Sequence, residues 1–459
     1  MCGIAGFCNF KEDFEENTDY WNFRLEKMRA VLAHRGNDAR GRYLKKHIGL
    51  SHSRLAIRDI LCGDQPMTRT HNGYDYTICY NGEIYNTDEL IPELSENGFV
   101  CSTTSDTEVI LYAYIHWGAD FVNRLNGIFA FAIWDAAKSQ LLLYRDRVGV
   151  KPLFYAIRGD SLVFGSEPKA CFAHPAVKPE LDKQGLQELL AIGPAHTSGL
   201  SLFKDLFEVL PGHFMIYSRD GLHDETYWEL TSREHTESYR DTVAHTRFLV
   251  EDAIKRQMVS DVPVCTFLSG GIDSSIVTAI AANYMNTRGK TLNTFSFDFK
   301  DNDRYFKANA FQPERDLPYV NRMLEEYETA HSYLECDENS LFKALFAAVD
   351  AKDMPGMTDV DSSLLYFCSL VSRKNKVALT GECADEIFGG YPWFYRKELL
   401  ERYGFPWSSD VAPRLALLRD DVGFELDLSG YQAFRYEESR SKAPLLYGEA
   451  GEDESRRII

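Results

Sequence analysis

The pattern of apolar residues changes once along this 459-residue chain, near residue 219, and the two patterns belong to different kinds of fold. Up to about residue 218, short runs of aromatic and β-branched residues alternate with turn residues, which predicts strands. The clearest runs are residues 76–80, 128–134, 141–144 and 214–217. Apolar residues spaced three or four apart also predict a helix: Trp21, Leu25, Met28 and Val31. This half therefore predicts a layered α+β domain.

The second half alternates strand and helix patterns. Strands are predicted at residues 262–268, 292–297 and 377–379, and helices at 272–285 and 318–327. Such alternation predicts a parallel sheet with right-handed crossovers. A chain of this length exceeds what one core usually organises, so two domains are expected, at 2–218 and 243–459. The polar stretch 219–242 between them is interpreted as a linker.

Composition narrows the class of protein. With 69 acidic and 50 basic residues, the net charge is −19, which argues against a general DNA- or RNA-binding protein. No run approaches the roughly 20 apolar residues that span a bilayer, and the N-terminus lacks the basic start of a secretory signal. The ten cysteines form no CxxC pair, which fits a reducing compartment. We expect a soluble cytoplasmic protein without nucleic-acid or membrane partners.

Cys2 is the first candidate for chemistry. Removal of Met1 would leave Cys2 with a free α-amino group, of pKa about 8, that could accept the proton of its own thiol. One residue would then supply both nucleophile and base. Because most free cysteines are only small buried apolar residues, this hypothesis depends on context.

Several other segments supply that context. Together with CGIAGF at residues 2–7, they resemble the class II glutamine amidotransferase domain, an N-terminal-nucleophile hydrolase, over residues 2 to about 210. The segments are HRG (34–36), SRLAI (53–57), NGEIYN (81–86), SDTE (105–108), RDRVGVKP (145–152) and FGSEPK (164–169). The resemblance implies an αββα sandwich fold and hydrolysis of glutamine at Cys2.

The resemblance assigns the oxyanion hole to Asn81 and Gly82. Attack of a thiolate on a carboxamide generates an oxyanion, which needs hydrogen-bond donors already in place. A side-chain amide and a backbone N–H supply two such donors. An Asn-Gly pair after a strand is also a common hairpin turn. Within NGEIYN we favour the oxyanion hole.

The resemblance also assigns residues that bind glutamine. Arg54 matches the ligand of the α-carboxylate and Asp106 the ligand of the α-ammonium, while Ile57, Asn81 and Glu83 match further contacts. An arginine suits this role because its guanidinium binds a carboxylate through two hydrogen bonds. The alternative for each charged residue is a surface ion pair.

The segment SGGIDSS at residues 269–275 lies between a predicted strand and a predicted helix. Its glycines and the helix start offer backbone N–H groups to a phosphate. No GxxxxGK[ST] motif is present. The segment resembles the SGGxDS loop of ATP pyrophosphatases, an α/β adenine-nucleotide-binding fold. The resemblance implies contacts with ATP at Leu268, Ser269, Gly270, Gly271, Asp273, Ser274, Phe297, Thr380 and Gly381.

The segment GECADEIFGGY at residues 381–391 resembles the SGEGxDExFGGY segment of B-type asparagine synthetases. The resemblance ties Glu382 to formation of the acyl-adenylate and to the handling of ammonia. It implies that Asp385 and Asp273 hold Mg²⁺ on the pyrophosphate, as hard oxygen ligands should. The alternative is that these acids only begin a solvated helix.

Together these resemblances imply one reaction. Cys2 hydrolyses glutamine, ammonia travels internally, and the second domain uses ATP to convert aspartate to β-aspartyl-AMP, from which ammonia displaces AMP to give asparagine. Two alternatives stay open: an amidotransferase that amidates or cyclises another carboxylate, and a glutaminase-only or non-catalytic homologue. Paired subunits are common in the family, so a homodimer is also expected.

Two features depart from the family. The helical subdomain that follows GGY in complete B-type synthetases, with its basic lysine, is not found. Residues 449–459 have acidic residues first, as at the start of a helix, but the sequence ends before any helix C-cap. Both favour a C-terminally shortened chain. Residues 353–363 are acidic where ligands of aspartate would be sought, and no arginine for that substrate can be assigned.

Overall fold

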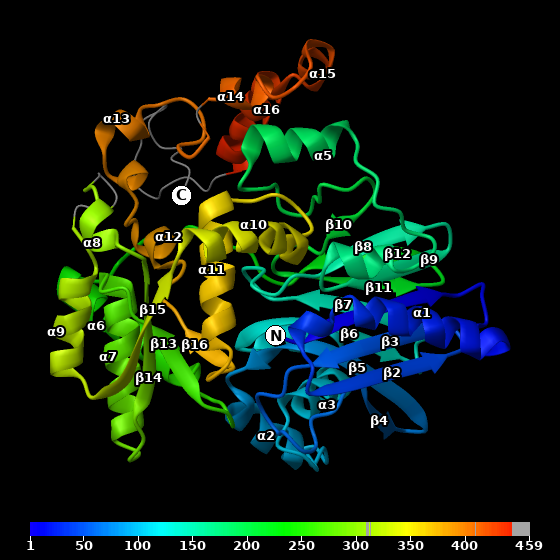
Figure 1. Cartoon of the computed structure of the whole chain (residues 1–459). Coiled ribbons are helices and arrows are strands. Elements are labelled where there is room, and N and C mark those ends of the chain that lie inside the picture. Colours follow the sequence, from blue (N-terminus) through cyan, green and yellow to red (C-terminus); the bar gives the residue numbers. More distant parts are fainter. Residues whose placement is uncertain (309–311, 313, 409, 443–459) are drawn as a thin grey trace. The chain divides into compact units, whose positions relative to one another are not determined.

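The computed structural model describes residues 1–308, 312, 314–408 and 410–442 (Figure 1). The chain divides into two compact units. The first comprises Met1–Leu189 and Ala195–Leu230, and the second comprises Leu190–Pro194 and the chain from Thr231 onward. The residues 449–459, expected to begin a helix, lie outside the described part of the chain.

The first unit contains two antiparallel six-stranded sheets. The first sheet has the order β10 (Phe207–Glu208), β8 (Phe154–Arg158), β9 (Ser161–Gly165), β1 (Gly3–Asn9), β3 (Ile48–Arg54) and β2 (Ala39–Lys45). The second has the order β12 (Gly221–Thr226), β11 (His213–Ser218), β7 (Gln140–Arg145), β6 (Gly127–Asp135), β5 (Tyr74–Ile84) and β4 (Met67–His71).

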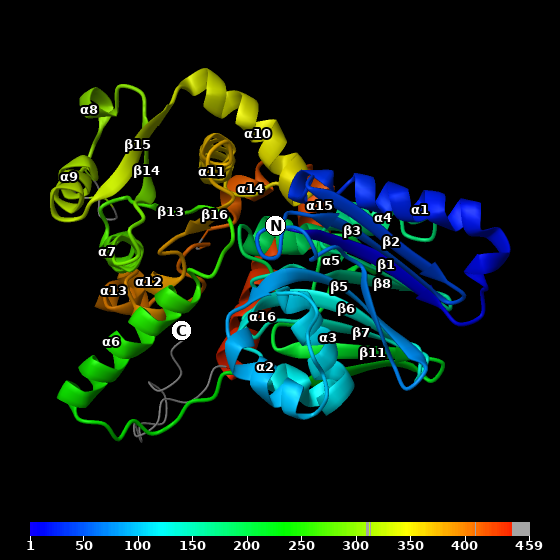
Figure 2. The same cartoon turned by 90° about the horizontal axis from the view of Figure 1, so that it is seen from below.

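Helices cover the outer face of each sheet, so the unit has four layers (Figure 2). The first sheet packs against α1 (Thr18–Ala30) and α4 (Pro168–Phe172). The second packs against α2 (Thr87–Glu96) and α3 (Asp106–Trp117). A third cluster of apolar residues fills the space between the two sheets. The expected αββα sandwich is therefore confirmed. A short helix, α5 (Lys183–Gln187), lies between α4 and β10 in the chain.

Strand β1 carries apolar residues on both of its faces. Ile4 and Cys8 point into the core between the sheets, whereas Ala5 and Phe7 point toward the outer helices. Alternate residues of a strand face opposite sides, so a strand covered on both faces has apolar residues at most positions. All seven residues of β1 are buried.

The second unit is built on a parallel four-stranded sheet with the order β15 (Thr329–Cys336), β14 (Leu292–Phe299), β13 (Val264–Phe267) and β16 (Val377–Leu379). Val264 packs with Ala281 and Ala282 of α7 (Ile272–Asn286), whereas Cys265 packs with Phe367 and Val371 of α11 (Thr358–Val371). Helices therefore lie on both faces, and the expected parallel α/β fold is confirmed.

The remaining helices of the second unit surround this sheet or follow it in the chain. They are α6 (Tyr239–Arg256), α8 (Asn302–Tyr305), α9 (Leu317–Glu326), α10 (Glu338–Lys352), α12 (Ala384–Phe388), α13 (Lys397–Leu400), α14 (Ala412–Leu415), α15 (Asp420–Leu426) and α16 (Leu428–Lys442). Among the described residues, no helix combines the length and apolar character needed to cross a membrane.

The segment 219–242 differs from the linker that its polar sequence suggested. Residues 221–226 form β12, which pairs with β11 as the edge strand of the second sheet. Residues 239–242 are the first turn of α6, so a boundary at residue 243 would cut that helix. Edge strands often carry polar residues because one edge of their backbone meets water. This strand therefore gives the same polar signal as a linker.

Candidate functional site

Cys2 directly precedes β1, and the pairing of β1 with β3 decides what lies beside it. Gly3 is opposite Ser53, so Cys2 lies near the end of β3 and the residues that follow. The backbone N–H of Leu55 donates a hydrogen bond to Cys2 Sγ over 3.3 Å. Burial raises the pKa of the Cys2 thiol, which keeps it protonated until a base removes the proton.

A charged cluster holds the backbone of Cys2. Arg35 Nε donates to the carbonyl oxygen of Cys2 over 2.9 Å, and Arg35 Nη1 donates to Glu167 over 2.7 Å. Burial opposes the ionisation of Glu167, but hydrogen bonds with His34 and Arg35 lower its pKa to about 2. Glu167 is therefore a fixed anion that orients Arg35. Burial, and then the charge of Arg35, lower the pKa of the Met1 amine to about 6.

Asn81 and Gly82 do not form a hairpin turn. Both lie within β5, opposite Ala130 and Phe129 of β6, so the strand continues beyond the predicted residues 76–80. Asn81 is 1% exposed, and its side-chain nitrogen has no hydrogen-bond partner among the described residues. An unpaired buried donor is unfavourable unless a ligand satisfies it. The side-chain amide of Asn81 is therefore a buried hydrogen-bond donor without an acceptor in the described part of the chain, as an oxyanion hole requires.

The backbone of Gly82 faces the same region. Strand β4 pairs only with residues 74–78 of β5, which leaves the later part of that edge without a strand partner. The N–H of Tyr80 donates to Gln65 and the N–H of Ile84 donates to Asp106 at this edge. Because N–H groups two residues apart point to the same side of a strand, the N–H of Gly82 also points there.

Two carboxyl groups lie together beside this edge. Asp106, the first residue of α3, accepts hydrogen bonds from the hydroxyl of Tyr80 over 2.9 Å and from the N–H of Ile84 over 3.1 Å. Burial and the neighbouring Asp106 raise the pKa of Glu83 to about 8. The guanidinium of Arg58 lies 4.0 Å from the carboxylate of Asp106. The pair suits an ammonium group, whose charge would favour ionisation of both acids.

Arg54 lies at the end of β3 with 6% of its side chain exposed. Its guanidinium already donates to a neighbouring loop, at residues 58–64. One terminal nitrogen bonds to Asp64 and to the carbonyl of Ile60, and the other bonds to the carbonyls of Arg58 and Asp59. In this structure Arg54 therefore orders the loop, and its binding of a glutamine carboxylate stays a prediction.

One cavity of about 320 Å³ brings most of these residues together. It is lined by Cys2, Arg54, Leu55, Ile57, Arg58, Gly63, Gln65, Tyr80, Gly82, Glu83, Ser105, Asp106 and Thr107. Six residues of this set were predicted from the sequence: Cys2, Arg54, Ile57, Gly82, Glu83 and Asp106. Tyr80 and Gln65, whose hydrogen bonds support Asp106 and the open edge of β5, were not predicted. Their contacts join distant segments and leave no local pattern.

The segment 269–275 of the second unit runs from the end of β13 into the first turn of α7, as expected. Gly270 has a φ of +83°, a left-handed conformation that glycine adopts without strain. The hydroxyl of Ser274 lies 3.0 Å from that of Ser269 and donates to the carbonyl of Gly271 over 3.1 Å. Ser274, in the first turn of α7, and Ser269 therefore together shape the loop that precedes the helix.

The segment after β16 lies against this loop. A methyl group at Gly381 would stand only 2.7 Å from Cβ of Asp273, so the two backbones are in contact there. In the sheet, β13 has β14 on one side and β16 on the other. Ligands of open α/β sheets bind at such a change of direction, beyond the carboxyl ends of the strands. Thr380 and Gly381 lie directly beyond the carboxyl end of β16, and the next residue, Glu382, is exposed.

A second cavity, of about 300 Å³, lies at the carboxyl ends of β13, β14 and β15. It is lined by Leu268, Ser269, Ser296, Phe297, Asp298, Asn302, Gln312, Asp316, Val320 and Tyr333. Leu268, Ser269 and Phe297 were named from the sequence. The polar residues of this cavity, such as Asp298 and Tyr333, were not named. Their hydrogen bond over 3.1 Å joins neighbouring strands.

Asp273 and Asp385 were expected to hold a metal ion. Burial, and then the negative charge of Asp273, raise the pKa of Asp385. A divalent cation would relieve this repulsion, so the two carboxylates fit Mg²⁺ in their chemistry. Among the described residues, no group of three or more acids, histidines or cysteines forms a metal site. Other ligands would have to come from phosphate oxygens and water.

Comparison with known proteins agrees with this division of the chain. Family models match a glutamine amidotransferase domain at residues 1–228 and asparagine synthase at residues 245–457. The chain is 47% identical, over its whole length, to asparagine synthetase [glutamine-hydrolyzing] 3 of Bacillus subtilis, and spans 74% of that protein. It is 32% identical to the amidase chyE of Penicillium rubens, over 90% of this chain and 62% of that protein.

Among solved structures, the glutamine phosphoribosylpyrophosphate amidotransferase of Bacillus subtilis matches 86% of this chain and 98% of its own, at 16% identity and a TM-score of 0.40. The two matched domains define a glutamine amidotransferase joined to a synthase domain. The chain belongs to the glutamine-hydrolysing asparagine synthetases.

Proposed function

We propose that this chain synthesises asparagine from aspartate, with ATP and with ammonia from glutamine, through β-aspartyl-AMP. One observation carries the proposal. A single cavity contains the Cys2 thiol and the paired acids Glu83 and Asp106, and the unpartnered amide of Asn81 lies in the adjoining strand β5. These groups match the thiol nucleophile, the ammonium site and the oxyanion donor that glutamine hydrolysis needs.

The glutaminase step begins after Met1 is removed. The freed amine of Cys2 takes the thiol proton, and the thiolate attacks the side-chain amide carbon of glutamine. Asn81 and Gly82 donate hydrogen bonds to the oxyanion. Burial and Arg35 lower the pKa of the Met1 amine to about 6, so this end of the chain disfavours a charged amine. The proton then passes to the departing ammonia, and water releases glutamate from the thioester.

In the synthetase step, residues 269–275 offer backbone N–H groups to the pyrophosphate of ATP. Leu268, Phe297, Thr380 and Gly381 contact the AMP portion. Asp273 and Asp385 would hold Mg²⁺, which neutralises phosphate charge when it is bound. Glu382 supports formation of the acyl-adenylate and handling of ammonia.

The glutaminase step is assigned to the first compact unit, which ends at Leu230, and the synthetase step to the second, which resumes at Thr231. Ammonia is protonated in bulk water and then no longer acts as a nucleophile, so internal transfer is part of the proposal. A homodimer is proposed by resemblance to the family. A cytoplasmic location is proposed because all ten cysteines are free thiols, as a reducing compartment maintains them.

The experiment is glutamine-dependent formation of AMP in the presence of aspartate. Cys2→Ala removes the nucleophile, so glutamine-dependent formation should fall to background, while the reaction with added ammonia continues at the parent rate. Mass spectrometry of the parent should show a chain that begins at Cys2. Glutamine-dependent synthesis by Cys2→Ala would overturn the proposal.

A second candidate is amidation of a different carboxylate. The similarity to an amidase over 90% of this chain favours this candidate, because that relative does not bear the name of an asparagine synthetase. Exchange of labelled pyrophosphate into ATP separates the two functions. Exchange that depends on aspartate supports asparagine synthesis, and exchange that depends on another acid supports the second candidate. A chain without exchange that still hydrolyses glutamine acts only as a glutaminase.

A further inference from the structure

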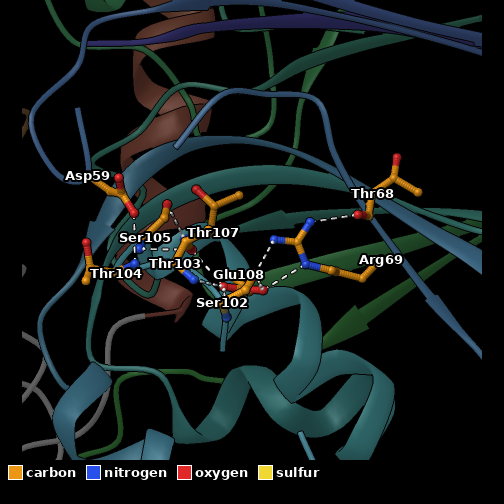
Figure 3. A network of polar contacts seen from close by, with 9 residues as sticks. All are labelled: Asp59, Thr68, Arg69, Ser102, Thr103, Thr104, Ser105, Thr107 and Glu108. Carbon is orange, nitrogen blue, oxygen red and sulfur yellow. Dashed lines mark hydrogen bonds and ion pairs between the residues drawn. The ribbon is translucent and has the colours of Figure 1, made fainter. Parts of the chain in front are cut away.

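Glu108 makes an unusually complete set of hydrogen bonds for a residue outside the catalytic cavity (Figure 3). Its side chain is fully buried in the first turn of α3. It accepts hydrogen bonds from the N–H and hydroxyl of Ser102, over 2.9 Å each, and from the N–H and hydroxyl of Thr103, over 2.7 Å each. Arg69 Nε of β4 donates a fifth, over 2.8 Å.

These bonds keep Glu108 ionised although it is buried. Burial alone would raise its pKa, but the hydrogen bonds from Thr103 and Arg69 outweigh this effect and lower the pKa below its ordinary value. A buried carboxylate with several charge-assisted hydrogen bonds holds its neighbours in one arrangement. Here the neighbours are β4, the start of α3 and the loop 102–105 between α2 and α3.

The arrangement departs from the usual way in which such a glutamate caps a helix. Ser105 is the N-cap of α3, and a glutamate three residues after an N-cap serine commonly binds the N–H of that serine. In this chain the N–H of Ser105 donates to Thr103 Oγ1 instead. Glu108 reaches past the helix end and binds the loop, so its carboxylate does more than close the helix.

The loop 102–105 continues the connection to the other side of the cavity. The N–H of Thr104 donates to Asp59 Oδ2 over 2.8 Å. The carbonyl oxygen of Asp59 in turn accepts a hydrogen bond from Arg54 over 2.5 Å. An unbroken series of contacts therefore runs from Glu108, through the loop and Asp59, to Arg54. At its other end, Glu108 lies two residues after Asp106 in the same helical turn.

We propose that Glu108 is a positioning residue for substrate recognition, which sets the separation between Arg54 and Asp106. The inference rests on the proposed function, in which these two residues bind the α-carboxylate and the α-ammonium of glutamine. Both charges of an amino acid are bound well only if their two ligands stand at the correct distance. Glu108 contacts neither charge and acts through the loop 102–105 and Asp59.

The first test is Glu108→Gln, which keeps the size of the side chain and removes its charge. The KM for glutamine should rise about ten-fold, within the range of coupling inside one hydrogen-bond network, while kcat stays within about two-fold. The rate at which iodoacetamide alkylates Cys2, measured on the Cys2 peptide, should stay unchanged because the nucleophile is not disturbed. A purely structural role would lower the active fraction, and with it kcat, without moving KM.

The matched control is Glu93→Gln. Glu93 pairs with Arg124 on the surface of the same unit, with 44% of its side chain exposed, and should change neither constant. A second variant, Asp59→Asn, leaves one acceptor oxygen for the two N–H groups of Cys62 and Thr104, and so weakens the connection at Thr104 while Glu108 stays in place. It should also raise KM. Because both residues act through one network, the double variant should raise KM by less than the product of the two single effects.

The outcomes separate the inference from the proposed function. A parent that does not hydrolyse glutamine, or that does so without Cys2, overturns both. If the parent is active but Glu108→Gln leaves KM unchanged or lowers only kcat, the inference alone fails. If Glu108→Gln does not fold, Asp59→Asn carries the test, and an unchanged KM for that variant overturns the inference.

Discussion

At the scale of single residues, the cavity that contains Cys2 holds two carboxyl groups that resist being charged together. Burial and Asp106 raise the pKa of Glu83 to about 8. Near neutral pH, Glu83 therefore keeps its proton in the free protein. An ammonium ion in the cavity favours the ionised form, so binding of glutamine should release a proton.

We therefore expect glutamine to bind more weakly as the pH falls from 8.5 to 6.5, by up to about ten-fold per pH unit below the pKa of Glu83. Calorimetry on the inactive Cys2→Ala chain, in buffers of different ionisation enthalpy, measures both the affinity and the proton release. Glu83→Gln should bind glutamine more weakly and with less dependence on pH. An affinity of Cys2→Ala that is constant over this range would contradict the assignment of Glu83.

At the scale of elements, the short helix α12 begins in an unusual way. Its N-cap residue is Cys383, with a φ of +69° in the left-handed region. A side chain in this conformation costs about 1 kcal/mol relative to glycine, because Cβ crowds the backbone. The family segment that this region resembles has glycine at the matching position. The backbone here therefore keeps the shape that suits glycine although the residue is cysteine.

Cys383→Gly should accordingly stabilise the second unit by up to about 1 kcal/mol, after the greater freedom of glycine in the unfolded chain is subtracted. The midpoint of urea unfolding of that unit measures the change. Cys62→Gly is the control, measured on the unfolding of the first unit, since Cys62 is also exposed but does not have a positive φ. It should be neutral or destabilising. Equal stabilisation by both variants would refute the argument from φ.

At the scale of the whole molecule, each unit has its own core and its own cavity. The thiol cavity belongs to the first unit, and the cavity at the ends of β13, β14 and β15 belongs to the second. A ligand stabilises the unit that binds it, by about 2.7 kcal/mol when its concentration is 100 times Kd. Each substrate should therefore stabilise a different unit.

In calorimetry of the Cys2→Ala chain, glutamine should raise the unfolding temperature of the first unit, and ATP with Mg²⁺ that of the second. Leu25→Ala identifies the first transition, because Leu25 is fully buried between α1 and the first sheet. This substitution should destabilise that unit by about 2–5 kcal/mol. The assignment of sites to units is wrong if ATP raises only the transition that Leu25→Ala lowers.

Much of the fold follows from local patterns. The runs at 128–134, 141–144 and 214–217 became β6, β7 and β11, since their residues are apolar and β-forming. The polar edge strand β12 was taken for a linker, and β15 was not predicted. Seven of its eight residues are partly or fully exposed, which weakens the apolar signal on which prediction depends.

The candidate site shows the same limit. Motifs identified Cys2, Asn81, Arg54 and Asp106 because their chemistry is carried by short segments. The importance of Tyr80 and Glu108 appears only when distant segments meet: the hydroxyl of Tyr80 binds Asp106, and Glu108 joins β4 to the loop 102–105. Neither contact produces a repeat or a spacing along the chain.

The sequence by itself determined the kinds of chemistry available, the two-part organisation and most of the strands, because these depend on residues close together in the chain. Only the tertiary structure decided that Asn81 and Gly82 continue a strand, and that Arg54 holds the loop 58–64. Strand pairing decides the first, since β5 lies beside β6 through contacts about fifty residues apart. Packing in three dimensions decides the second, because a guanidinium binds whichever acceptors the folded chain brings within reach.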